Sequence, residues 1–542
     1  MRTLVLAAAP LVVGALVVPA TAASDAGAPA AASSVQPNPD HIKTLSAVLQ
    51  TMTANYSSFA TSTPGPQDIL DYRIGDLWLN GVDGSGTTIA LLEGWDDPQI
   101  GSVIHDFDQK YGLPDPDIQT IYPSGALPAQ CPPGMVALGS YGSCSAWAGE
   151  LRLDVEAAHL VAPYAKILIS ATPADSEITD DAASQVAPPE FMRAIEDIAS
   201  NHLANAISIS DGTGESTYSY GKAEVTAQDP GPLTAAAAGI PVLVATGDCG
   251  VLQNLAVASS QCGNTTKGPD TAAWDDSPWV TAVGGSVPNF SSSGTRLGPD
   301  PLWHSGIYSE GAGYSAVYGQ PDYQRRIEPS GGMRSVPDIT MDAQRGTSES
   351  APLFAGVLAL AAQLKGGDVG PVDTALYSLL GPQGARGGIA DVVSGNNSVT
   401  SGNTVVAPGF SAGPGFDVAS GWGTIDAATF VPALVAASRT EIGYNAPSQQ
   451  AGRALAALQH GIQLTSGIVQ PGDTTYLLAP GFLPQHPVEL DIDGKKIATL
   501  TANTLGSVSY LIDPAALALP AGPHTVTLRS MLLTASAQFR SV

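Results

Sequence analysis

Short apolar runs rich in Val, Ile and Leu recur between about residues 65 and 430, and helical patterns separate them. The predicted strands lie in the segments GTTIALLEG, AKILISA, AISIS, IPVLVATGD and WVTAVGG. Helical spacing of apolar residues covers 147–161, 189–203 and 231–239. Apolar, β-branched strands that alternate with helices are typical of a parallel sheet covered by helices on both faces. The pattern therefore predicts an α/β domain over residues 65–435.

The pattern changes after about residue 440, where short alternating runs and Gly/Pro turns replace the helices. VELDIDGKKIATL contains two alternating runs joined by Asp493-Gly494, which is a strong hairpin signal. HTVTLRS alternates again. These features predict a β-sandwich of immunoglobulin-like type over residues 440–542. We expect a structural or spacer module there rather than a catalytic one, and the sequence does not identify a partner for it.

The N-terminus has the pattern of a secretory signal over residues 1–22. Arg2 supplies a positive charge, an apolar stretch follows, and Ala20-Thr-Ala22 precedes the predicted cleavage point. Because the apolar stretch is short for a membrane span, we expect a secreted, extracellular protein without membrane contact once the signal is removed. Residues 23–64 are rich in Ala, Ser, Thr and Pro and indicate a short leader or linker with one helix at 41–53.

The chain is strongly acidic, with a formal net charge of −27 over 542 residues. A field of this sign disfavours nucleic acid and anionic membranes as partners. The acidity suits an acidic medium, although solubility alone explains it equally well. Apolar residues make up 44% of the chain, which is enough for a large core. We expect a monomer.

The four cysteines form two close pairs along the sequence, Cys131 with Cys144 and Cys249 with Cys262. In an oxidising compartment, local disulfides are the natural interpretation of such spacing. The sequence alone permits three connectivities.

The segment QRGTSESAPLFAG, residues 344–356, contains a candidate nucleophile. Gly-Thr-Ser-x-x-x-Pro at the start of a buried helix is typical of subtilisin-type hydrolases, whose serine needs a base. None of the eight histidines has a suitable setting. The single His-Gly pair, His460-Gly461, follows the serine and lies outside the α/β part. A histidine base for Ser348 is therefore disfavoured.

In the absence of a suitable histidine, three carboxylates are candidate catalytic residues. Glu150 and Asp154 lie one turn apart on the apolar face of the helix predicted at 147–161, where an unpaired charge is costly. Such a pair favours a shared proton and a shifted pKa. Asp248 follows an apolar strand, at the kind of sheet edge where ligands gather. Taken alone, each of these residues also fits a structural role, as a proton-sharing pair or as the cap of a turn.

Taken together, the ordered motifs resemble the sedolisin family, the serine-carboxyl peptidases, over about residues 65–428. The motifs are GELRLDVEAAHLVAP, VATGDCG, VTAVGGS, LWHSGIYSEGAGYSAVYGQPDYQ, SVPDITMDAQRGTSESAP and GPGFDVASGWGTI. The resemblance implies a subtilisin-like fold and a Ser-Glu-Asp triad in a sedolisin-like peptidase domain. Ser348 is then the nucleophile, Glu150 the general base and acid, and Asp154 the residue that orients Glu150. Asp248 takes the oxyanion position, where an aspartate donates a hydrogen bond only when protonated.

The resemblance also implies one structural calcium ion. In the family an Asp and the carbonyl of the next residue, followed by a Gly-x-Gly-x-Asp loop, hold the ion. The matching residues here are Asp391, Val392, Gly413, Gly415 and Asp417. Carboxylate and carbonyl oxygens are hard ligands of the kind that Ca²⁺ prefers.

The resemblance thus implies a secreted, acid-acting serine-type endopeptidase that acts on protein or peptide substrates, and the sequence leaves a tripeptidyl-type exopeptidase open. The alternative is a catalytically weak, secreted binding or surface protein with the same fold. It is favoured by the roughly 40 residues between signal and catalytic part, because relatives carry a long prosegment there. Arg345 also departs from the family pattern, since relatives often have Gly at this place. An esterase is disfavoured because the candidate nucleophile Ser348 does not lie in a Gly-x-Ser-x-Gly motif.

Overall fold

The structure is a computed structural model of the chain. The residues that it describes are 37–59, 63–123, 125–131, 135–136, 143–172, 189–218, 222–226, 228–253, 262, 268–292, 295–327, 332–402, 404–440, 442–443, 446–459, 462–464, 467–472, 474–479, 481–482, 486–502, 508–530 and 534–542. The predicted signal peptide lies outside this part of the chain. No helix within the described residues is long and apolar enough to cross a membrane.

A seven-stranded sheet forms the centre of the α/β part, in the order β11-β6-β5-β4-β1-β3-β2, and every pair in it is parallel. Its strands are β1 (Thr88–Glu93), β2 (Ile118–Ile121), β3 (Lys166–Ala171), β4 (Ala206–Ile209), β5 (Val242–Ala245), β6 (Thr281–Ser286) and β11 (Ile339–Asp342). The predicted parallel α/β sheet is confirmed. Each of the five apolar segments recognised in the sequence supplies one of its strands.

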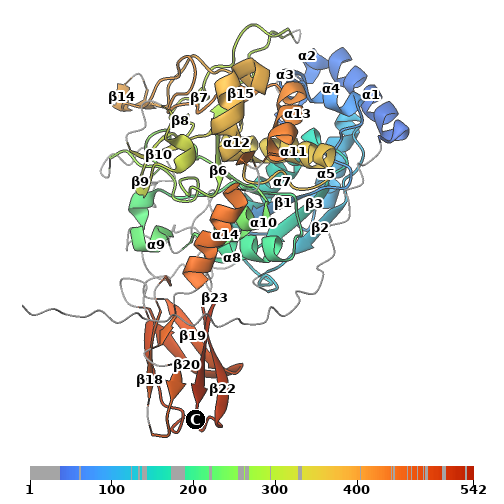
Figure 1. Cartoon of the computed structure of the whole chain (residues 1–542). Helices are drawn as coiled ribbons and strands as arrows, with labels where there is room; N and C mark the ends of the chain where they lie inside the picture. The colour runs from blue at the N-terminus through green and yellow to red at the C-terminus, as the bar shows by residue number, and fades with distance from the viewer. Residues whose placement is uncertain are drawn as a thin grey trace, which may run out of the picture. The chain divides into compact units, whose positions relative to one another are not determined.

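Helices cover both faces of this sheet (Figure 1). The longer ones are α1 (Pro39–Ala54), α5 (Ile100–Tyr111), α7 (Cys144–Val161), α8 (Pro189–Ser200), α10 (Pro230–Ala238), α11 (Thr347–Lys365), α13 (Ala427–Ser438) and α14 (Ala446–Gln459). Along β1, Ile89 and Leu91 belong to a core shared with α5, α7, α11 and α13. Ala90 and Leu92, which point the other way, belong to a core shared with α8 and α10. A strand buried on both sides explains why the sequence shows continuous apolar runs rather than alternation.

Shorter elements connect these layers. They are α2 (Tyr56–Phe59), α3 (Pro66–Asp71), α4 (Ile74–Leu79), α9 (Lys222–Thr226), α12 (Val372–Ala375), β7 (His304–Ser305), β8 (Tyr308–Ser309), β9 (Gly313–Gly319), β10 (Met333–Val336), β12 (Ile389–Ala390), β13 (Val399–Ser401), β14 (Thr404–Ala407) and β15 (Thr424–Ile425).

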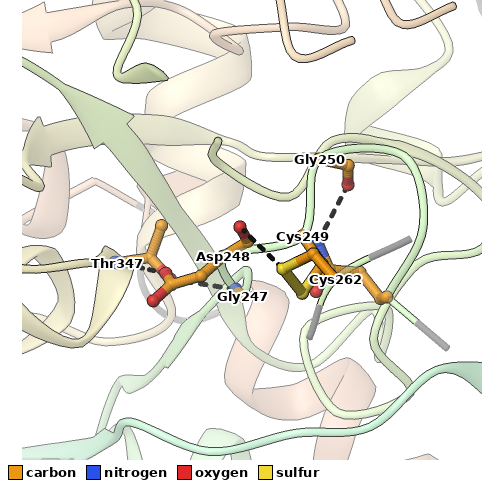
Figure 2. The surroundings of a disulfide bond; sticks show 7 residues. Gly247, Asp248, Cys249, Gly250, Cys262 and Thr347 are labelled. Atoms are coloured by element: carbon orange, nitrogen blue, oxygen red, sulfur yellow. Dashed lines mark hydrogen bonds between the residues drawn. A yellow bond between two sulfur atoms is a disulfide. The ribbon is translucent and has the colours of Figure 1, made fainter. Parts of the chain in front are cut away.

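Two disulfides close short segments of the α/β part, Cys131–Cys144 and Cys249–Cys262. Of the three possible connectivities, the structure therefore has the local one. Figure 2 shows Cys249–Cys262 beside Asp248 and Thr347.

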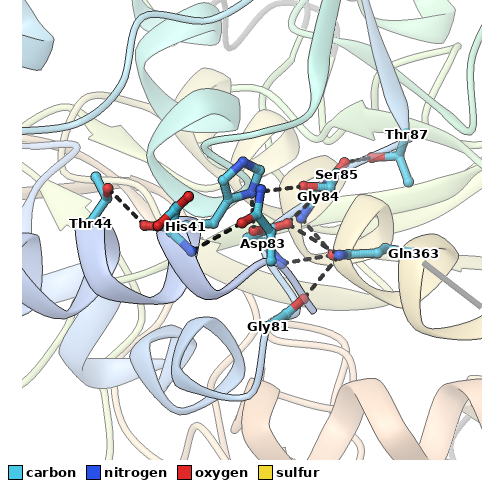
Figure 3. A network of polar contacts seen from close by, with 10 residues as sticks. His41, Thr44, Gly81, Asp83, Gly84, Ser85, Thr87 and Gln363 are labelled. Atoms are coloured by element: carbon cyan, nitrogen blue, oxygen red, sulfur yellow. Dashed lines mark hydrogen bonds and ion pairs between the residues drawn. The ribbon is translucent and has the colours of Figure 1, made fainter. Parts of the chain in front are cut away.

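The helix expected at 41–53 is α1, and it packs on the main core through Leu45 and Val48. Figure 3 shows the polar contacts at its start. His41 Nδ1 lies 2.9 Å from Asp83 Oδ2, and the ring stacks on Tyr164. Gln363 of α11 in turn accepts hydrogen bonds from the backbone N–H groups of residues 83 and 84, both at 2.7 Å. The helix is thus fixed to the α/β part, and the domain boundaries stay a prediction.

The C-terminal part contains two small sheets that share one apolar core. One is β16-β18-β21 and the other is β17-β23-β22-β19-β20. Their strands are β16 (Gln463–Leu464), β17 (Ile468–Val469), β18 (Thr475–Ala479), β19 (Pro487–Ile492), β20 (Lys495–Thr501), β21 (Val508–Ile512), β22 (Gly522–Arg529) and β23 (Thr534–Ser541). Asp493 and Gly494 join β19 to β20 with positive φ angles, which confirms the predicted hairpin. The immunoglobulin-like type of this part stays a prediction.

Candidate active site

Ser348 lies in the first turn of α11, directly after a short connection from β11. The helix is preceded by Gly346, whose φ of +93° favours glycine. A Cβ atom at Gly346 would also come within 2.5 Å of Asp248 Oδ2. Beyond Ser348 the helix is buried from Glu349 to Gln363. The serine therefore lies at the N-terminal end of a helix that runs through the core.

Glu150 lies on α7, and its carboxyl is within hydrogen-bonding reach of the Ser348 side chain. Its Oε1 atom is buried and has no hydrogen-bond partner. Burial, followed by the charges of Asp248 and Asp211, raises the pKa of Glu150 to about 7. The hydrogen bond from Ser348 and the charge of Arg345 act in the opposite direction. The structure therefore brings together the serine and the carboxyl that the sequence paired.

Asp154 lies one turn further along α7 and is fully buried. Ser210, which follows β4, donates to its carboxyl with a distance of 2.8 Å from Oγ to Oδ2. The same Oγ lies 3.2 Å from the carbonyl oxygen of Ser348. Burial and the neighbouring Glu150 raise the pKa of Asp154 well above its usual range. Two neighbouring carboxyls in such a setting favour a shared proton.

Asp248 follows β5 and faces the start of α11. Its Oδ1 accepts hydrogen bonds from Thr347 N at 2.8 Å and from Thr347 Oγ1 at 3.1 Å. Burial raises the pKa of Asp248, and the two hydrogen bonds from Thr347 partly offset this. Helix α7, strand β5 and helix α11 thus bring all four candidate residues to one edge of the sheet.

Two further carboxyls, which sequence reasoning missed, lie beside this group. Glu93, the last residue of β1, is fully buried and neither of its carboxyl oxygens has a hydrogen-bond partner. Burial raises its pKa well above the usual range, and the charges of Asp154 and Glu150 raise it further. Asp211 follows β4, and burial raises its pKa to about 6. Both residues stand at carboxyl ends of strands, as Asp248 does, and this position was a usable signal in the sequence.

Arg345, three residues before Ser348, carries a positive charge that acts on Glu150. Its side chain is 45% exposed, and its Nη1 lies 3.3 Å from both Glu156 Oε2 and the carbonyl oxygen of Thr63. Its charge lowers the pKa of Glu150. Arg345 is therefore coupled to the candidate base while its head group remains accessible to solvent.

The two segments predicted to hold calcium lie together. Gly415 N donates to Asp391 Oδ2 at 2.8 Å, and Gly413 N donates to Asp417 Oδ2 at 2.7 Å. Asp391 Oδ1 is buried and has no hydrogen-bond partner. An orphaned, buried carboxylate oxygen in a segment tied to a second carboxylate loop fits a hard cation.

A second acidic cluster lies beneath the serine and consists of Asp68, Asp342 and Glu349, all fully buried. Glu349 Oε2 accepts a hydrogen bond from Arg345 N at 3.0 Å. Burial is the main cause that raises the pKa of each of the three carboxyls, to about 6 for Asp342. The raised pKa values favour protonated, uncharged carboxyls in acid, and neighbouring carboxyls can share a proton.

Comparison with known proteins identifies the relatives of this chain. No family model matches it. Kumamolisin from Bacillus sp. (strain MN-32) is 27% identical over 400 residues, which cover 67% of this chain and 63% of that protein. The solved structure of Pseudomonas sedolisin, a serine-carboxyl proteinase complexed with two molecules of pseudo-iodotyrostatin, matches with a TM-score of 0.56 at 23% identity. The match covers 69% of this chain and 97% of that one. These likenesses support membership of the sedolisin family.

The family contains proteins with more than one named activity. Tripeptidyl-peptidase sed5 from Aspergillus fumigatus is 34% identical over 206 residues, which cover 30% of this chain and 34% of that protein. The chain spans less than two thirds of the length of both kumamolisin and the tripeptidyl-peptidase. The family expected from the ordered motifs is confirmed, and the likeness to Pseudomonas sedolisin establishes the fold of the α/β part.

Proposed function

We propose that this chain is a secreted serine-type peptidase that hydrolyses peptide bonds of proteins or peptides in acid. The observation that carries the proposal is the Ser348 side chain within reach of Glu150, a buried carboxyl whose pKa is raised to about 7. Relatives named as a serine-carboxyl proteinase and a tripeptidyl-peptidase support the same reaction class. The two disulfides fit an oxidising compartment.

In the proposed reaction, Ser348 Oγ attacks the scissile carbonyl carbon while its proton passes to Glu150. The tetrahedral intermediate collapses as Glu150 returns that proton to the leaving amine, and an acyl-enzyme remains. Water then attacks the ester with Glu150 as base, and the acid product leaves as Ser348 regains its proton. Asp154 holds Glu150 in place and shares a proton with it.

Asp248 is the proposed donor to the oxyanion. A carboxyl donates a hydrogen bond only in its protonated form, and burial favours that form by raising the pKa of Asp248. Glu150 must be unprotonated when it acts, and its raised pKa opposes this in strong acid. The two requirements overlap on the acid side of neutrality and predict a bell-shaped dependence of kcat on pH.

We also propose one structural calcium ion, held by the carboxylates of Asp391 and Asp417 and the carbonyls of Val392, Gly413 and Gly415. The support is the unpartnered, buried Asp391 Oδ1 and the hydrogen bonds that tie both Asp391 and Asp417 to the Gly413–Gly415 segment. When bound, the ion supplies positive charge that neutralises the two carboxylates.

The function is tested with purified protein and a denatured protein substrate between about pH 3 and pH 7. We expect cleavage that Ser348→Ala abolishes, with an unchanged circular dichroism spectrum. Ser102→Ala, at an exposed serine of α5, is the matched control and should keep full activity. A peptide-library digest then separates internal cuts, expected of an endopeptidase, from N-terminal tripeptide release. A folded, calcium-loaded sample without cleavage at any pH would instead favour a catalytically weak binding protein.

A further inference from the structure

One cysteine of each disulfide lies close in sequence to a candidate catalytic carboxyl, and the separation along the chain differs between the two disulfides. Cys249 follows Asp248 directly. Cys144 is the first residue of α7 and stands more than a helical turn before Glu150. The sequence separation of the bonded cysteines is 13 in both cases. The two bonds therefore close loops of equal length next to two different parts of the site.

The segment that carries Asp248 has little regular structure to hold it. Strand β5 ends at Ala245, and Gly247 and Gly250 adopt positive φ angles of 85° and 57°. A few hydrogen bonds to neighbouring loops hold its backbone: Ser309 N donates to Asp248 O at 3.0 Å, and Gly250 N donates to Ser309 O at 2.9 Å. Gly247 O accepts from Gly311 N at 2.7 Å, and Gly247 N donates to Thr347 Oγ1 at 2.9 Å. A loop bounded by two such glycines has many alternative conformations open to it.

The disulfide lies against this same loop (Figure 2). Cys249 is only 5% exposed, and Cys262 Sγ lies 3.5 Å from the carbonyl oxygen of Asp248. A disulfide sulfur carries no proton, so this contact is one of packing. On the other side, the Asp248 carboxyl is held by Thr347, the residue before the candidate nucleophile. Asp248 is thus fixed between the disulfide and the start of α11.

We propose that the Cys249–Cys262 disulfide is a positioning element for Asp248, so that the rate of the chemical step depends on this bond. The inference rests on the function proposed above. A donor to the oxyanion acts only when it is held at hydrogen-bonding distance from the developing charge. A displacement of about 1 Å is enough to lose much of the effect. Loss of the bond should therefore lower kcat and leave KM nearly unchanged.

The other disulfide provides a matched comparison. Helix α7 is held by its own hydrogen bonds, by the Ser143 cap and by packing of Leu151 and Val155 on the core shared with α11. The positions of Glu150 and Asp154 therefore do not depend on Cys131–Cys144. Because the two closed loops are equally long, removal of either bond should destabilise the fold to a similar extent.

The experiment compares the double variants Cys249→Ser/Cys262→Ser and Cys131→Ser/Cys144→Ser. We expect similar decreases in Tm in both. We expect kcat to fall about tenfold or more in the first and to stay within about twofold of the wild type in the second, with KM nearly constant in both. Equal losses of kcat in the two variants, or an unchanged kcat in the first, would overturn the proposal.

Asp248→Ala separates this proposal from the proposed function. In its background, removal of Cys249–Cys262 should lower kcat no further, because the group that it positions is gone. A further tenfold loss there would contradict the positioning role alone. An unchanged kcat in Asp248→Ala by itself would instead contradict the role of Asp248 as the oxyanion donor. The positioning role of the Cys249–Cys262 disulfide would then be contradicted as well.

Limited reduction of the wild-type protein gives the same comparison if a double variant does not fold. Dithiothreitol supplies two electrons and two protons to each disulfide and becomes a cyclic disulfide itself. Mass spectrometry of alkylated peptides measures how far each of the two bonds has opened. Activity should decline with the opening of Cys249–Cys262. A decline that follows Cys131–Cys144 instead would overturn the proposal.

Discussion

Ser348 and Glu150 come from two different helices, and the proposed chemistry depends on one proton that passes between them. Glu150→Gln keeps the shape of the side chain but removes its ability to accept that proton. We expect kcat to fall by about 10²–10⁴-fold. The matched control is Glu156→Gln on the same helix, whose carboxyl contacts Arg345. A similar loss in that control, or in His105→Gln at an exposed histidine, would argue against Glu150 as the base.

Arg345 allows the electrostatics of the base to be tested without changing a reacting group. Its positive charge stabilises the ionised form of Glu150 and so lowers its pKa. In Arg345→Gln the pKa of Glu150 should rise, and the acid limb of the kcat profile should move to higher pH by several tenths of a unit. Because Arg345 is 45% exposed, salt should reduce the shift.

The control for this change is Arg152→Gln on α7. The Arg152 side chain pairs with Asp97 rather than with Glu150, so its loss should leave the acid limb in place. Both shifts are measured from kcat between about pH 3 and pH 7. An equal shift in the two variants would show that the overall charge of the protein, rather than Arg345 in particular, determines the pH dependence of kcat.

At the scale of single elements, the proposed calcium site can be tested through its effect on stability. A cation that binds only the folded state raises stability by about 2.7 kcal/mol at a hundred times its Kd. Calcium should therefore raise the Tm of the wild type and have no effect on Asp391→Ala. Magnesium serves as the control ion, because it demands a smaller and more regular site. A Tm that changes with neither chelator nor calcium would contradict the proposed calcium site.

Helix α14 offers a second test at this scale. Ala451 of α14 packs with Leu233 and Ala236 of α10, although α14 lies beyond the predicted boundary at 440. Removal of residues 462–542 should leave peptide hydrolysis largely unchanged. Removal of residues 440–542 should in addition lower Tm, because it uncovers apolar side chains of α10. If both truncations melt at the same temperature, α14 contributes nothing to the α/β part.

Much of this element structure could be predicted from the sequence. The apolar strands were visible because they are buried on both faces, and Asp493-Gly494 marked its hairpin. Glu150 and Asp154 were visible because carboxyls on an apolar helix face are unusual. Glu93 and Asp211 were missed because their meaning depends on which strands are neighbours, with β1 between β3 and β4. Strand order arises from long-range packing, which local patterns do not record.

At the scale of the whole molecule, the many buried carboxyls make stability depend on pH. Burial raises the pKa of Asp229 to about 7 and the pKa values of Asp300 and Asp342 to about 6. The folded state therefore holds these protons more tightly than the unfolded chain does. Their contribution is fully present below about pH 4, the usual range of a free carboxyl, and is lost as pH rises through 6 to 7.

We therefore expect Tm to be highest in acid and to fall as pH rises from about 4 to about 8, since each pKa unit corresponds to about 1.4 kcal/mol. Asp229→Asn should make this decline shallower, because the amide remains uncharged and still accepts the hydrogen bond from Tyr318 Oη at 2.7 Å. The control Asp322→Asn changes an exposed carboxyl and should leave the slope as it is. Thermal unfolding followed by circular dichroism across this pH range measures all three slopes. A Tm that rises toward neutral pH would contradict the view that buried, protonated carboxyls adapt this fold to acid.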